Sequence, residues 1–166
     1  MNSALRLIET LDFEIEVFTR LAAGRPREDA GYRAIQAIPG IGAVLAAVFV
    51  AEIGDIGRFP GPAQLASWAG LTPTHRESDT SVHRGRITKQ GSRLVRWAAV
   101  EAVQRLPAHT RLGGIRDRIG ARRGRNIGVV AAARELTELV CYGLRDHHIR
   151  CLPPPDRAPD TAPMPA

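Results

Sequence analysis

The sequence contains few cysteines and few aromatic residues, and no long hydrophobic run. Its two cysteines, Cys141 and Cys151, cannot build a disulfide framework or a four-ligand metal site. No stretch approaches the roughly 20 uncharged apolar residues that a membrane-spanning helix needs. Residues 1–16 carry acidic side chains where a signal peptide would have an apolar segment. These absences predict a cytoplasmic protein with no membrane partner.

Lysine is also nearly missing, although the chain is basic. Of 23 basic side chains, 22 are arginines and only Lys89 is a lysine, and the formal net charge is +6. A GC-rich genome would favour arginine codons everywhere, whereas phosphate recognition would favour them locally. Residues 75–125 hold thirteen basic and four acidic residues, and the rest of the chain is mildly acidic. This uneven distribution favours a nucleic-acid-binding surface.

Apolar periodicity predicts a mainly α fold for the 166 residues, of which 44% are hydrophobic. Helices are expected near residues 32–38, 43–53, 63–69, 92–106 and 127–144, with a short helix and a loop over 109–126. Residues 72–91 show no alternating strand pattern, and they predict a long basic loop that has room for a hairpin. The Pro-rich segment 152–166 is expected to be disordered. The expected architecture is a small helical bundle over residues 30–145.

Residues 1–23 predict a separate helix. Its apolar residues alternate spacings of four and three, as in a coiled-coil seam: Ala4, Ile8, Leu11, Ile15, Phe18 and Ala22. The same pattern also suits an ordinary amphipathic helix lying on the core. Both interpretations remain open from the sequence alone.

The turn Pro39-Gly40-Ile41-Gly42 lies between two predicted helices, within residues 32–53. Two glycines allow a close backbone approach, and the positive end of the next helix dipole can face a phosphate. The arrangement is typical of a helix-hairpin-helix that contacts the DNA backbone through Gly40 and Gly42. A plain interhelical turn is the alternative. The nearby acids Glu52 and Asp55 are more typical of helix caps than of metal ligands.

The segment 72–91 offers hydroxyl nucleophiles among cations. Ser78 and Ser81 are the candidate nucleophiles, and His75 or His83 could transfer the proton. The candidate DNA-binding cations are Arg76, Arg84, Arg86, Lys89 and Arg93. Serine attack on a phosphodiester needs such cations to stabilise charge in the transition state. The alternative is a solvated polar loop.

Several segments in order resemble a known family. They are IQAIPGIGAVLAAVFVAEIGDIGRF, LASWAGLTP, the serine-containing basic segment and GRITKQGSRLVRWAAVEA. Together they are similar to the C-terminal part of the insertion-sequence-110 type transposases, which are bridge-RNA-guided serine recombinases. The resemblance implies that the nucleophile is Ser78, with Ser81 as the alternative, and that Gly85, Ile87, Lys89 and Gly91 match the family's next segment. The family's usual Ser-Gly pair is Ser78-Asp79 here.

The resemblance also carries expectations about partners. The family has an N-terminal RuvC-like domain whose acids hold Mg²⁺, and this sequence shows no such domain. We therefore expect no cofactor in this chain, Mg²⁺ only with the RuvC-like domain, and a fragment that is inactive alone. DNA, a guide RNA and a homo-oligomeric partner are implied. A non-catalytic helix-hairpin-helix DNA-binding module, an inactive transposase remnant and a purely structural helical protein are the alternatives.

Overall fold

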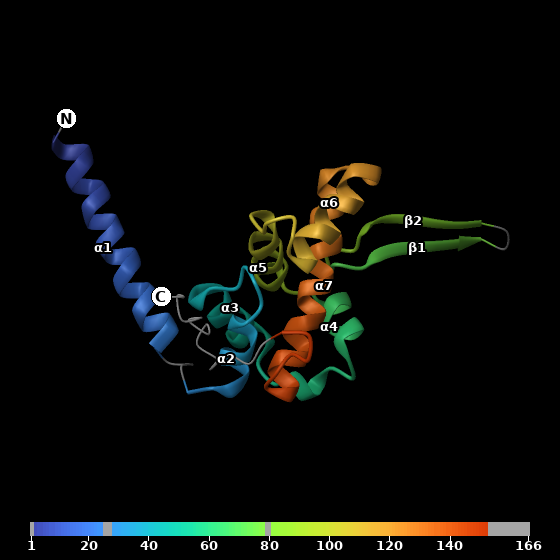
Figure 1. The fold of residues 1–166 in the computed structure, drawn as a ribbon, viewed down its shortest axis with the longest axis horizontal. Helices are drawn as coiled ribbons and strands as arrows, with labels where there is room; N and C mark the ends of the chain where they lie inside the picture. Colours follow the sequence, from blue (N-terminus) through green and yellow to red (C-terminus); the bar gives the residue numbers. More distant parts are fainter. Residues whose placement is uncertain (1, 25–27, 79–80, 153–166) are drawn as a thin grey trace, which may run out of the picture.

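The computed structural model describes residues 2–24, 28–78 and 81–152. The elements in chain order are α1 (Asn2–Gly24), α2 (Ala30–Gln36), α3 (Ala43–Ile53), the 3₁₀ turn η1 (Ile56–Arg58), α4 (Pro62–Trp68), β1 (Pro73–Ser78), β2 (Ser81–Ile87), α5 (Arg93–Gln104), α6 (Arg111–Arg123) and α7 (Arg125–Asp146). The protein is mainly helical, as the sequence predicts (Figure 1). None of the described helices is long and apolar enough to cross a membrane.

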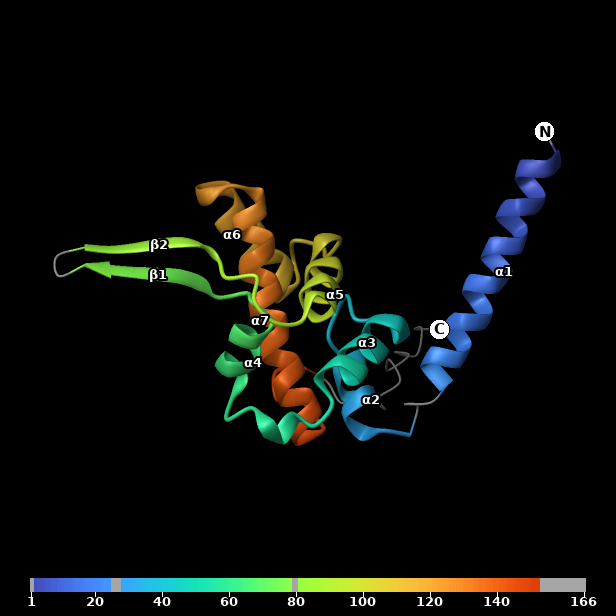
Figure 2. The ribbon, with the colours of Figure 1, turned by 180° about the vertical axis from the view of Figure 1, so that it is seen from behind.

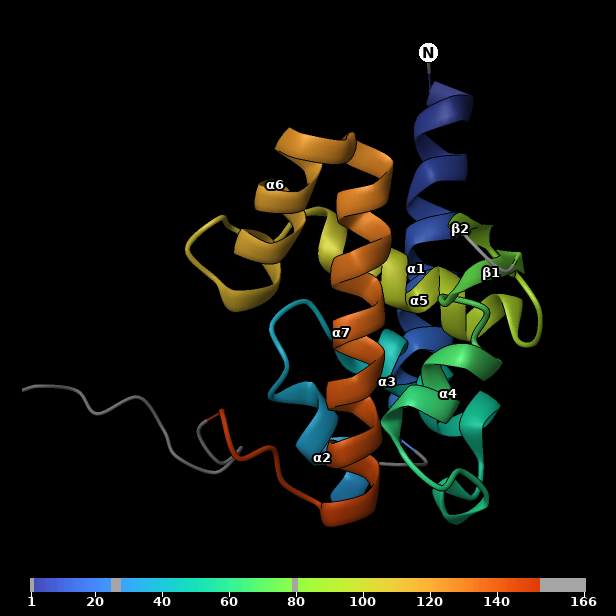
Figure 3. The ribbon, with the colours of Figure 1, turned by 90° about the vertical axis from the view of Figure 1, so that its right-hand side faces the viewer.

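Helix α7 is the centre of the helical body. Helices α2, α4, α5 and α6 all contact it, and α3 packs against α2 and α5 (Figure 3). The fully buried side chains include Ile35, Phe49, Leu65, Val95 and Leu136, which come from five different helices. Small residues of α7, such as Ala132 and Ala133, allow the neighbouring helices to approach closely. The core thus forms around one long helix.

Helix α1 projects away from this body (Figures 1 and 2). It contacts α3, but its large apolar side chains remain exposed, including Ile8, Leu11, Ile15 and Phe18 at 52–64%. The expected helix is present, and the interpretation that it lies flat on the core is wrong. Its apolar seam is available to another chain.

Residues 73–87 form the hairpin for which the sequence leaves room, in place of a loop without strands. Strands β1 and β2 pair in antiparallel register, with the Cα of Arg76 opposite His83 and that of Ser78 opposite Ser81. The hairpin points away from the helices on the side opposite α1 (Figures 1 and 2). Apolar alternation marks a strand only when one face packs on a core. An arm that projects from the body gives no such signal.

Residues 111–146 also differ from the expectation. A 13-residue helix, α6, and a 22-residue helix, α7, meet at Gly124, whose φ of +98° permits the sharp turn between them. Thr110 caps α6 by accepting a hydrogen bond from the Gly113 N–H at 3.1 Å. The segment expected as a short helix and a loop is therefore almost wholly helical. The proline-rich expectation for residues 152–166 falls outside the described residues beyond Leu152.

Candidate nucleic-acid interface

The base of the hairpin is held against the end of α4 by close backbone contacts. Gly91 has a φ of +73°, and a Cβ at this position would lie 1.8 Å from the carbonyl oxygen of Trp68. Gly70 has a φ of +70°, and its Cβ would lie 2.4 Å from the carbonyl oxygen of Gln90. Only glycine fits both positions. Two distant segments therefore meet without side chains between them.

Hydrogen bonds fasten the same base. The Lys89 N–H donates to the Gly70 carbonyl at 3.1 Å, and the Thr88 N–H donates to the Thr72 carbonyl at 3.0 Å. The half-buried Arg96 guanidinium donates to the carbonyl oxygens of Ala69 at 2.8 Å and Gln90 at 3.3 Å. Arg96 lies on α5, so one arginine links α4, the hairpin base and α5. The orientation of the hairpin of β1 and β2, called the arm below, is thereby fixed relative to the helical body.

Two further contacts support the start of α5 and the end of α4. Ser92 caps α5 by accepting from the Val95 N–H at 3.1 Å, and its hydroxyl donates to Glu52 at 2.7 Å. Arg58 lies over the rings of Phe59 and Trp68, with its guanidinium carbon 4.6 and 4.8 Å from their centroids. The first contact joins α3 to α5, and the second joins η1 to α4.

The predicted site residues fall into two groups. Arg86, Lys89 and Arg93 are exposed at or near the base and form no hydrogen bond or ion pair through their side chains with the described residues. Lys89 has a φ of +55°, which is uncommon outside glycine. Arg76, Ser78, Ser81 and Arg84 lie in the strands, but the side chains of residues 75–84 are outside the described part. The arm and its base thus carry the predicted serines and cations.

The turn at residues 39–42 lies elsewhere. Gly40 has a φ of +92°, and its Cβ would stand 2.2 Å from the carbonyl oxygen of Ala102 on α5, so packing requires this glycine. Gly42 begins α3 with no side-chain cap, and no atom lies within 4 Å of its Cβ position. Ala102 is ten residues along α5 from Ser92, or about 15 Å at the helical rise. The two predicted motifs therefore occupy opposite ends of α5.

An arginine that the sequence did not single out organises the C-terminal helices. Arg116 donates to Asp117 at 2.7 and 3.0 Å, and to the last carbonyls of α5, Val103 at 2.9 Å and Gln104 at 2.8 Å. The hydrogen bond from Arg116 lowers the pKa of Asp117, and the same bond raises the pKa of Arg116. The two charges are therefore matched within the protein. Non-local contacts of this kind leave no pattern in the sequence.

The described residues offer no evident metal site. No group of three or more histidine, cysteine or acidic side chains among them is placed to hold a metal ion. Asp55 accepts from the Gly57 N–H at 2.8 Å, and Glu52 accepts from Ser92. Asp55 is thus a helix cap, at the start of η1, whereas Glu52 lies within α3 and accepts a side-chain hydrogen bond instead of capping a helix.

Comparison with known proteins identifies a family whose match covers the hairpin and the elements that hold it. The family described as Transposase IS116/IS110/IS902 matches residues 32–117, which run from the start of the core to the middle of α6. This chain belongs to that transposase family. The matched stretch includes the turn at residues 39–42, the hairpin and the complete base that holds it.

Three relatives are each much longer than the part that this chain matches. It is 31% identical over 133 residues to an uncharacterized 44.8 kDa protein of insertion element IS116 from Streptomyces clavuligerus, over 78% of this chain and 33% of the relative. It is 41% identical over 64 residues to the 43.6 kDa protein of IS110 from Streptomyces coelicolor, over 39% and 16%. It is 29% identical over 100 residues to the transposase of IS1111A from Coxiella burnetii, over 60% and 26%. The matches span a third or less of each relative.

Proposed function

We propose that this family member binds DNA and carries the serine for strand cleavage and transfer in transposition. The observation that supports this most is the arm itself: a basic hairpin projects from the body while its base is held by Gly70, Gly91 and Arg96. A protruding element on a rigid base can enter a DNA groove without an additional ordering cost.

The charges around the base favour phosphate binding. Arg86, Lys89 and Arg93 have no acidic partner among the described residues, so their charges are available to a ligand. Arg76 and Arg84 lie further along the strands. Guanidinium groups bind phosphate oxygens through two parallel hydrogen bonds. The five cations would hold the DNA backbone along the arm.

The proposed chemistry is a transesterification at Ser78. Its Oγ attacks the phosphorus of a phosphodiester, a new Oγ–P bond forms, and the bond from phosphorus to the leaving sugar oxygen breaks. His75 or His83 accepts the serine proton, and the leaving oxygen takes up a proton. The resulting phosphoserine link is reversed when a sugar hydroxyl attacks it. Ser81, opposite Ser78 in the register, is the alternative nucleophile.

Other proposed contacts do not depend on the serine. The uncapped start of α3 at Gly42 would contact DNA phosphates, with Gly40 shaping the turn. Sequence choice would come from a guide RNA, and Mg²⁺ would be supplied by a RuvC-like domain that these 166 residues do not include. No step at the hairpin is assigned to a metal held by the described residues.

DNA titrations test the role of the arm. The triple variant Arg86→Ala, Lys89→Ala, Arg93→Ala should bind duplex DNA more weakly, with a salt dependence reduced by about 2–3 units in log–log slope, since each phosphate contact contributes about 0.9. The control is Arg6→Ala, Arg33→Ala, Arg150→Ala, which removes the same charge at three exposed positions elsewhere. Equal binding by both variants would contradict the role of the arm. A non-catalytic DNA-binding module remains the alternative if binding depends on the arm but no covalent link forms.

A further inference from the structure

We propose that the corner where α6 meets α7 is a second phosphate-binding surface, which holds duplex DNA independently of the hairpin. This arginine corner consists of Arg118, Arg122, Arg123 and Arg125. It begins directly after residue 117, where the family match ends. The inference rests on the proposed function only for the identity of the ligand, and it needs neither Ser78 nor the arm.

The charge of the corner is uncompensated. Its four arginines are exposed and form no hydrogen bond or ion pair through their side chains with the described residues. No acidic residue occurs from 118 to 134, and the preceding acid, Asp117, is held by Arg116 through two hydrogen bonds. Four cations within eight residues repel one another, and a polyanion would relieve this repulsion. The corner therefore favours a phosphate-rich partner.

The backbone beneath these arginines is closely packed. A Cβ at Gly128 would lie 2.2 Å from the carbonyl oxygen of Arg116 and 2.8 Å from the amide nitrogen of Gly120. The first turns of α7 therefore lie directly against the last turns of α6. Gly124 joins the two helices with a φ of +98°. A rigid frame reduces the entropy lost when the side chains bind a ligand.

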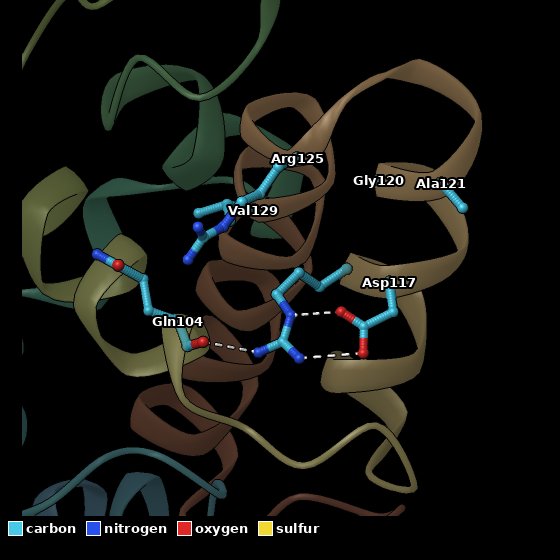
Figure 4. Close-up of a pocket in the computed structure, with 7 residues that line it drawn as sticks. Gln104, Asp117, Gly120, Ala121, Arg125 and Val129 are labelled. Atoms are coloured by element: carbon cyan, nitrogen blue, oxygen red, sulfur yellow. Dashed lines mark hydrogen bonds and ion pairs between the residues drawn. The ribbon is translucent and has the colours of Figure 1, made fainter.

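A hollow of about 340 Å³ opens beside the corner (Figure 4). It is lined by Gln104, Arg116, Asp117, Gly120, Ala121, Arg125 and Val129. Asp117 matches the charge of Arg116, whereas Arg125 brings an unpaired guanidinium to the lining. Gln104 offers a neutral hydrogen-bonding amide. A backbone phosphate that entered the hollow would meet one free cation within the described lining and no free acid.

The corner is placed so that one DNA duplex could contact both it and the arm. The corner and the hairpin both lie away from α1 (Figure 1), and the corner forms the N-terminal end of α7, with α6 on one side of this helix and the hairpin on the other (Figure 3). Residues 111–130 contain no aromatic side chain, so the corner lacks the aromatic platform on which single-strand binders stack successive bases. Phosphates on the outside of a duplex need no stacking. Duplex DNA is therefore the partner that this surface fits.

Titration of the complete 166-residue chain with a labelled duplex DNA of about 30 base pairs tests the proposal. The variant Arg122→Ala, Arg123→Ala, Arg125→Ala should bind about tenfold more weakly near 0.1 M salt, with a log–log salt slope reduced by about 2–3. The matched control is again Arg6→Ala, Arg33→Ala, Arg150→Ala, which should bind within about twofold of the unmodified protein. Replacing the same corner arginines by lysine should retain the salt slope, because the charge is kept.

The outcomes separate the corner from the arm. Loss of binding in the arm variant alone would overturn the corner and leave the proposed function intact. Loss in the corner variant alone would support the corner and contradict the role of the arm. The corner variant should also be titrated with a duplex RNA of the same sequence. If, relative to the unmodified protein, it bound this RNA more weakly but bound the DNA equally well, the assignment of the corner to DNA would be overturned. If the alanine variant melts early, Arg118→Gln with Arg122→Gln leaves the helix junction untouched and should reduce the slope by about 1–2.

Discussion

The carbonyl oxygen of Trp68 stands 1.8 Å from the position that a Cβ on Gly91 would occupy. This contact ties the segment that follows the hairpin to the end of α4, across 23 residues of sequence. It explains why a glycine ends the segment GRITKQG, and it makes the orientation of the arm a property of the folded body. The role of the arm depends on this contact.

Replacement of Gly91 by alanine should therefore damage the base. The methyl group collides with the Trp68 carbonyl, and alanine is strained at a φ of +73°, which together cost about 2 kcal/mol or more of unfolding free energy. Urea unfolding measures the loss. The control is Gly42→Ala, where φ is −84° and no atom lies within 4 Å, so its stability should change by less than about 0.5 kcal/mol. Equal stability of the two variants would contradict the close packing.

The exposed seam of α1 should drive self-association. Ile15 occupies a seam position and Phe13 does not, although each is 62% exposed. In light scattering after gel filtration, we expect the unmodified protein to be oligomeric, Ile15→Glu to shift it to the monomer, and Phe13→Glu to leave it unchanged. A monomeric unmodified protein would rule out the coiled-coil interpretation of this helix.

The pair Arg116 and Asp117 should make stability depend on pH. The hydrogen bond from Arg116 lowers the pKa of Asp117, so its stabilising effect is present above the unfolded pKa, near 3.9, and disappears as the pH falls through the lower folded value. Asp117→Asn should consequently lower the melting temperature at pH 7 and converge with the unmodified protein in strong acid. Glu101→Gln is the control, because Glu101 is exposed and pairs with no described residue. An equal deficit at every pH would contradict the charge pairing.

The two cysteines should react at different rates. Burial raises the pKa of the Cys141 thiol, although Arg145 lowers it in part, whereas Cys151 is exposed. Because the thiolate is the reactive species, Ellman's reagent should modify one thiol rapidly at pH 8 and the second only on unfolding. Cys151→Ser should remove the fast phase. A fast phase that survives this substitution would show that Cys141 is accessible.

Local patterns in the sequence predicted most of the helices. Residues 43–53 are apolar on nearly every side and match α3 as found, because a buried helix is evident from its composition. The sequence leaves room for a hairpin in residues 72–91 but does not define its strands, because an arm that lies away from the core needs no apolar face. The length of α6 was missed because glycines and arginines, such as Gly113 and Arg118, hide the period of 3.6 residues.

The candidate site was predictable only in part. The serines and cations of residues 72–91 were identified from residue type and family resemblance. The contacts that fix their base, from Arg96 to Ala69 and from Gly91 to Trp68, join residues more than 20 positions apart and follow only from the fold. The same holds for Gly40, whose conformation serves packing against Ala102.

The most direct test of the central proposal is to map a covalent adduct on the hairpin. Thymidine 5′-(p-nitrophenyl phosphate) is a suitable probe, since its leaving group departs without protonation. The attack on this probe therefore needs neither a target sequence nor the RuvC-like domain without which the full reaction is expected to fail. Serine attack would release p-nitrophenolate and leave a thymidylyl ester on the tryptic peptide of residues 77–84, where fragment spectra distinguish Ser78 from Ser81. We predict an adduct on Ser78 that persists in Ser81→Ala and is lost in Ser78→Ala. An unmodified hairpin, or an adduct that survives Ser78→Ala, would contradict the assignment of Ser78 as the nucleophile.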